Sequence, residues 1–111
     1  MYENWQQILM DLIVGYFSDE GAEAGLKQAA VVSVARESLY HDYVAALEAG
    51  IESAGRGESD VLRIVRPVKL LKDPAAAKVY LEWVLSRFQT LYDETVKARA
   101  ATPWPGDQGG T

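Results

Sequence analysis

The chain has 111 residues, the size of one ordinary domain, and a formal net charge of −5. It contains no cysteine and a single histidine, His41, which excludes disulfide bonds, thiolate metal sites and two-histidine metal motifs. The acidic balance argues against direct binding to nucleic acid. Residues 1–5 are unlike a signal peptide, and the apolar run at residues 12–17 is too short to span a membrane. We therefore expect a cytoplasmic protein with no membrane segment and no cofactor.

The charges are distributed unevenly along the sequence. Residues 1–60 contain eleven acidic and three basic side chains, whereas residues 61–111 contain five acidic and eight basic ones. The two parts therefore have net charges of −8 and +3. Whether the acidic and basic side chains are also separated in the folded protein depends on how the helices pack.

The first predicted helix covers residues 5–17. Asn4 is a suitable N-cap, and Gly21 can adopt the left-handed conformation in which many helices end. Apolar side chains recur at intervals of three and four residues, as on one face of an α-helix: Trp5, Ile8, Leu9, Leu12, Ile13, Tyr16 and Phe17.

Two further helices are predicted between residues 22 and 55, a stretch without proline. A single helix over this range would be about 50 Å long, which is too long for a domain of this size. We therefore predict a break between Arg36 and Leu39, with Ser38 as the cap of the second helix. The apolar positions form two series: Leu26, Ala30, Val31 and Val34, then Tyr40, Tyr43, Val44, Leu47, Ile51 and Ala54.

A loop is predicted at residues 55–60, where Gly, Ser and Asp cluster and Ser59 or Asp60 can cap the next helix. Residues 61–71 have the spacing of a helix that Pro67 kinks or splits into two short pieces. A strand at residues 61–65 is the alternative, although the chain offers no second strand to pair with it.

Asp73 and Pro74 mark the start of the last predicted helix, as N-cap and first helical residue. This helix runs to about Arg99, and residues 101–111 are predicted to be a tail without apolar periodicity. The sequence thus predicts an all-α, single-domain bundle of four to six helices without a sheet, formed by residues 1–100. The apolar and aromatic positions of the last predicted helix are Val79, Tyr80, Trp83, Val84, Phe88, Leu91, Tyr92 and Val96. Of the aromatic side chains in the whole sequence, Trp5, Tyr16, Trp83 and Tyr92 are expected in the core.

Patterns typical of catalysis are absent from the sequence. Glu37 and His41 are four residues apart and are interpreted as a solvated pair, because a carboxylate-bridged metal site in a bundle needs two Glu-x-x-His pairs. Ser33 and Ser38 lack the glycine-framed turn of a nucleophilic serine. We expect neither an enzyme nor a metal-binding protein. The basic run Arg63, Arg66, Lys69 and Lys72 is interpreted as a solvated helix face, or as a partner for the acidic half of the chain.

Tyrosines beside acidic side chains are the main indication of function. Tyr2, Tyr40 and Tyr43 all flank acidic residues. Tyrosine supplies a rigid ring with a polar tip, and carboxylates steer a basic partner. Such a surface is typical of a protein interface, and the alternative is that these tyrosines border the core.

The end of the first predicted helix, Gly15-Tyr-Phe-Ser-Asp-Glu20, resembles the opening of immunity proteins from bacterial contact-dependent growth inhibition systems. In that family an Ala- and Glu-rich helical stretch follows, as in residues 22–54 here. A late aromatic helix is similar to Tyr80-Leu-Glu-Trp-Val-Leu85. The family often has tryptophan soon after the acidic residues, where this chain has Gly21-Ala-Glu23.

The resemblance implies a protein that binds and neutralises the toxin domain of a delivered effector, often a basic RNase or DNase. We expect a heterodimer with that domain. The alternative is a small helical secretion chaperone or adaptor that binds a peptide or forms a homodimer. The residues expected to form the toxin-binding surface are Asp19, Glu20, Glu23, Glu37, Tyr40, Asp42, Tyr43 and Glu48.

Overall fold

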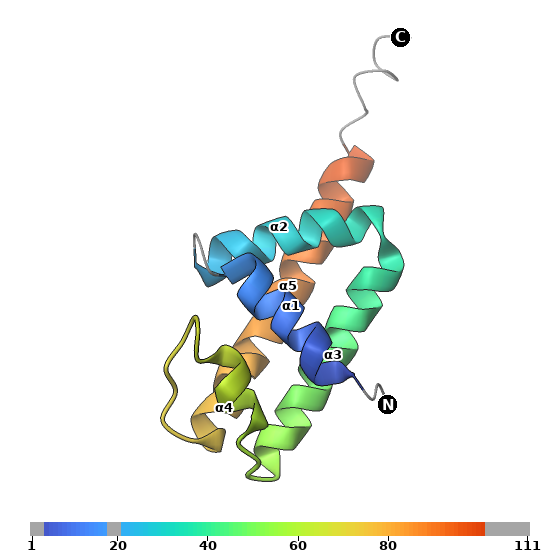
Figure 1. The fold of residues 1–111 in the computed structure, drawn as a ribbon. Coiled ribbons are helices and arrows are strands. Elements are labelled where there is room, and N and C mark those ends of the chain that lie inside the picture. Colours follow the sequence, from blue (N-terminus) through green and yellow to red (C-terminus); the bar gives the residue numbers. More distant parts are fainter. Residues whose placement is uncertain (1–3, 18–20, 102–111) are drawn as a thin grey trace, which may run out of the picture.

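The computed structural model describes residues 4–17 and 21–101, and in these residues it contains five helices and no strand (Figure 1). The helices are α1 (Trp5–Phe17), α2 (Ala22–Ala35), α3 (Glu37–Gly55), α4 (Asp60–Val65) and α5 (Pro74–Ala101). The predicted all-α single-domain bundle of four to six helices is confirmed. Of the predicted tail, residue 101 ends α5 and the rest lies outside the described residues. No helix in the described part of the chain is both long and apolar enough to cross a membrane.

The helices α2 and α3 form the two arms of a bent hairpin, and α1 and α5 pack against it from opposite sides (Figure 1). Both α1 and α5 contact both arms, whereas α4 contacts α1, α3 and α5. One core therefore holds all five helices together. Its large, fully buried apolar side chains come from every helix: Leu9, Leu12, Ile13, Leu26, Leu47, Val61, Val65, Leu81, Val84 and Phe88.

The ends of two helices follow the expected local chemistry. The backbone N–H of Ala76 donates to Asp73 Oδ1 at 2.9 Å, and Pro74 is the first residue of α5. These two features confirm the predicted start of the last helix. Between α1 and α2, Gly21 has a φ of 91°, a conformation that side chains with a Cβ rarely adopt.

The predicted break in the second helical stretch is a single residue, Arg36. It lies between α2 and α3 with a φ of −135°, and its N–H donates to carbonyl groups of the last turn of α2. Ser38 is not the cap of the second helix, because α3 already begins at Glu37 and Ser38 lies within it.

The helix predicted at residues 61–71 is correct only in its first part. The helix α4 ends at Val65, and residues 66–73 continue as turns and irregular chain. Pro67 has no N–H to extend the helical hydrogen-bond ladder, so the chain turns away here. Val68 and Leu71 still pack against the core, but from outside any helix.

Some apolar side chains that were expected to face inward are exposed. Trp83 is 45% exposed and Val31 is 54% exposed, and Val79 and Val96 are exposed as well. A helix buries only the stripe that its neighbours cover. For α2 that stripe contains Leu26, Ala29 and Ala30, and Val31 lies just beyond it.

Two serines are buried in the bundle and differ in their hydrogen bonds. The Ser33 hydroxyl is buried without a hydrogen-bond partner among the described residues, whereas the Ser53 hydroxyl donates to Glu58 Oε1 at 2.6 Å. An unsatisfied buried hydroxyl is costly, while a hydrogen bond to a carboxylate is stabilising.

Replacement of Ser33 by alanine is therefore expected to raise the free energy of unfolding by about 1 kcal/mol, because it removes the desolvated hydroxyl and improves helix propensity. Ser53→Ala is the matched control and is expected to lower it by about 1 kcal/mol. Urea unfolding followed by far-UV circular dichroism measures both. Loss of stability in Ser33→Ala would show that this hydroxyl has a partner.

Candidate functional site: the α3–α5 face

The expected toxin-binding residues do not form one surface. Asp19 and Glu20 lie outside the described residues. The expectation that Tyr43 is on the surface is wrong, since its side chain is only 5% exposed. Its ring packs against Tyr16 and Phe88 with centroid distances of 6.3 and 6.1 Å. Burial raises the pKa of the Tyr43 hydroxyl, which therefore stays neutral in the core.

Glu23, another expected binding residue, already has a partner within the protein. It lies in the first turn of α2, where Arg87 Nε of α5 donates to its Oε1 at 3.0 Å and Arg87 Nη2 donates to its Oε2. These hydrogen bonds hold the pKa of the Glu23 carboxyl below its usual range. Glu23 thus joins α2 to α5.

The remaining four residues lie on α3, but on two sides of it. Tyr40 and Glu48 are eight residues apart, and Glu37 and Glu48 are eleven apart, so all three share one side of the helix. Asp42 follows Tyr40 by two residues and therefore lies about 160° away around the helix. The side with Tyr40 and Glu48 is the one that meets α5.

The rings of Tyr40 and Tyr92 stack across the α3–α5 contact, with centroids 3.7 Å apart and planes inclined by 17°. Phe88 supports Tyr40 from the core, at a centroid distance of 5.4 Å. Burial raises the pKa of the Tyr40 hydroxyl, and the neighbouring Asp93 raises it further. Gln89 acts in the opposite direction and lowers this pKa. The Tyr40 hydroxyl is thus a neutral polar group beside the stacked rings.

A shallow groove of about 400 Å³ runs beside this aromatic pair, between α3 and α5. Ile51 and Leu85 supply apolar lining, and Glu48 and Glu82 line the groove from the two helices. Glu82 accepts a hydrogen bond from Lys78 at 2.8 Å.

We call this surface the α3–α5 face. Its residues are Glu37, Tyr40, Glu48, Ile51, Glu82, Leu85, Gln89, Tyr92 and Asp93.

In the part of the chain that the structure describes, three carboxylates of the α3–α5 face have no partner of opposite charge. Within the described residues, Glu37, Glu48 and Asp93 form no salt bridge, and all three are exposed. Unpaired carboxylates on both helices give this face a negative potential that attracts cations. An apolar groove, a rigid aromatic pair and free negative charge together suit the binding of a basic protein surface.

The contribution of α5 to this face was missed in the sequence. Tyr92 and Asp93 are adjacent, the same tyrosine–acid combination that singled out Tyr40 and Tyr43. This combination could have indicated a second surface tyrosine, but the apolar stripe of the last helix predicts that Tyr92 is in the core. It is half-buried, with one face of its ring covered by Tyr40.

The described residues contain no group of three or more His, Asp or Glu side chains placed to hold a metal ion. No family model, no curated protein and no solved structure matches this chain.

Proposed function

We propose that this protein is an immunity protein that binds a basic toxin domain through the α3–α5 face. The observation that carries the proposal is the stacked pair of Tyr40 and Tyr92 beside a groove rimmed by carboxylates. Rigid tyrosines are typical anchors of protein interfaces because they bury a large area at little cost in conformational entropy.

The charge of the face fits a nuclease as the target. A nuclease holds phosphate groups with lysine and arginine side chains, and carboxylates can occupy the same cations. The unpaired Glu48 and Asp93 would contribute mainly to the rate of association, because charge at the edge of an interface steers the encounter of the two proteins.

The test is a pair of double charge reversals with equal change in net charge. Glu48→Lys with Asp93→Lys alters the α3–α5 face, and Asp11→Lys with Asp42→Lys alters exposed or partly exposed positions elsewhere on α1 and α3. Each variant and the wild type serve as bait for a basic polypeptide from the source cells, and the association rate of the captured protein is then measured. We expect a loss of roughly tenfold for the first variant and little change for the second.

The captured protein must also be toxic when expressed alone and harmless when co-expressed with the wild-type chain. Equal association rates for the two double variants would rule out the α3–α5 face as the binding surface. Recovery of only a second copy of the chain, or of assorted unfolded proteins, would favour the chaperone or adaptor instead.

A further inference from the structure

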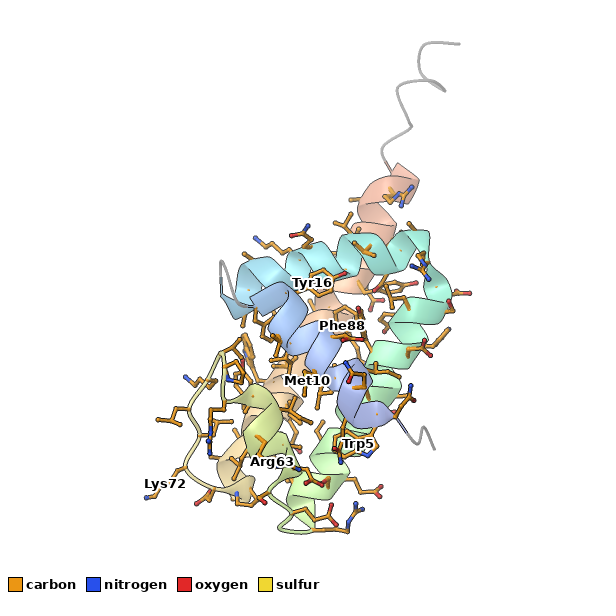
Figure 2. The ribbon with its side chains drawn as sticks, in the orientation of Figure 1. Trp5, Met10, Tyr16, Arg63, Lys72 and Phe88 are labelled. Carbon is orange, nitrogen blue, oxygen red and sulfur yellow. The ribbon has the colours of Figure 1, made fainter. Side chains whose placement is uncertain are left out.

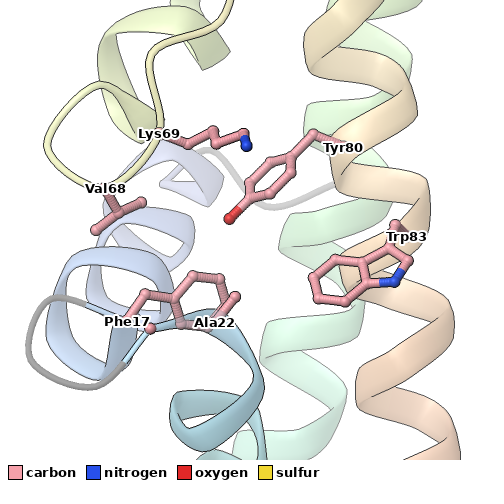
Figure 3. A pocket seen from close by; sticks show the side chains of 7 residues that line it. Phe17, Ala22, Val68, Lys69, Tyr80 and Trp83 are labelled. Atoms are coloured by element: carbon pink, nitrogen blue, oxygen red, sulfur yellow. The ribbon is translucent and has the colours of Figure 1, made fainter.

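A second groove lies on the side of α5 that faces away from α3. It has a volume of about 460 Å³ and is lined by Phe17, Ala22, Val68, Lys69, Tyr80 and Trp83. Figure 3 shows Phe17 and Trp83 on opposite sides of the opening, with the Tyr80 hydroxyl directed between them. We call it the Trp83 groove.

The side chains that line the Trp83 groove are mainly aromatic and apolar. The rings of Tyr80 and Trp83 are stacked with centroids 6.2 Å apart, and Phe17, the last residue of α1, is buried. Trp83 is 45% exposed, and Val79 and Leu70 nearby are exposed as well. Aromatic walls of this kind receive one large apolar side chain of a partner.

The groove opens beside the basic segment of the chain. Lys69 itself lines the groove, and Arg66 and Lys72 lie on the same irregular stretch after α4, where Figure 2 shows Lys72 extending outward. Because α4 ends before them, these cations do not form the stripe on one helix that was one interpretation of the sequence.

These cations differ from Arg63 and Arg87 in the same half of the chain. Among the described residues, Arg66, Lys69 and Lys72 form no salt bridge, whereas Arg63 binds Asp60 and Arg87 binds Glu23. Lys69 in the lining of the groove, with Arg66 and Lys72 on the same segment, complements carboxylates next to an apolar anchor.

We propose that the Trp83 groove binds an acidic protein segment that carries one large apolar side chain. The apolar side chain enters between Phe17 and Trp83, and the flanking carboxylates pair with Lys69 and its neighbours. This binding is independent of the proposed function, since no residue of the α3–α5 face lines the Trp83 groove.

The probe is a fluorescein-labelled peptide with a central Leu-Phe pair and three aspartates on each side. Its binding to the full chain is followed by fluorescence anisotropy, with the same peptide carrying lysines in place of the aspartates as control. We expect the aspartate peptide to bind at least roughly tenfold more tightly, and to weaken at about 0.5 M salt.

The variants test the contribution of the lysines and that of the aromatic wall separately. Lys69→Glu with Lys72→Glu should weaken the aspartate peptide roughly tenfold, and Trp83→Ser should do the same through loss of the apolar wall. Arg36→Glu with Lys97→Glu changes the net charge equally at exposed positions outside the groove and should leave the affinity unchanged. In an NMR titration, the signals of Trp83 and Tyr80 should shift.

Equal affinity for the two peptides, or unchanged binding by the groove variants, would overturn the proposal. Shifts confined to the α3–α5 face would overturn it as well. A concentration-dependent dimer that Trp83→Ser abolishes, with no binding of the aspartate peptide, would assign the groove to a second copy of the chain.

Discussion

Replacement of Gly25 by alanine is expected to lower the free energy of unfolding by about 3 kcal/mol. Gly25 is buried in α2, where this helix crosses the end of α1. A Cβ at this position would lie 2.7 Å from the carbonyl carbon of Tyr16 and 2.9 Å from Cδ1 of Phe17. The first of these is backbone, so the two helices would have to move apart and loosen the core around Phe17. Urea unfolding followed by circular dichroism measures the loss.

Gly15→Ala is the control for the Gly25 substitution, because it makes the same chemical change in a helix with open space around it. Gly15 lies on the exposed side of α1, and nothing is within 4 Å of where its Cβ would be. Alanine there is expected to raise stability by about 1 kcal/mol through helix propensity alone. If the two variants changed stability alike, the close approach of α1 and α2 at Gly25 would be wrong.

Much of the fold followed from local signals in the sequence. Asp73 and Pro74 determine the start of α5 through a side-chain cap and a fixed φ, both properties of the residues themselves. The break at Arg36 was predicted without a strong helix breaker, from the length that a domain of this size can cover. The helix start and the helix break could therefore both be predicted without knowledge of the tertiary packing.

The errors arose where burial depends on neighbouring helices. The spacing of Tyr40 and Tyr43 puts both near the boundary of one apolar stripe. Only the positions of α1 and α5 decide that Tyr43 is buried and Tyr40 is partly exposed. Trp83 was assigned to the core because it continues the stripe of α5. It is exposed because Pro67 ends α4 early and the irregular segment that follows leaves it uncovered.

The candidate site could be predicted only in part for a related reason. Tyr40 and Glu48 share one side of α3, which the helical period predicts directly. The stacking of Tyr40 on Tyr92 joins residues 52 positions apart. No periodicity in one helix can give that register, because it results from the packing of α3 against α5.

Phe88 connects the core to the α3–α5 face, and its replacement by alanine is expected to have the largest effect on stability, a loss of about 4 kcal/mol. The side chain is fully buried near the centre of the bundle and contacts both Tyr40 and Tyr43 (Figure 2). Alanine leaves a cavity beneath Tyr40, so the stacking on Tyr92 should also weaken, with a smaller near-UV circular dichroism signal from the tyrosines.

Phe88→Leu keeps most of the apolar volume and is expected to cost only about 1 kcal/mol. This variant also separates the effect on the free energy of unfolding from the effect on the position of Tyr40 in the α3–α5 face. Because leucine has no ring, Tyr40 loses its aromatic neighbour in the core while the protein remains folded. Urea unfolding should therefore show a small loss for leucine and a large one for alanine, with the tyrosine near-UV signal reduced in both. A signal unchanged in Phe88→Leu would mean that Tyr92 alone holds Tyr40 in place, and that the core does not shape the α3–α5 face.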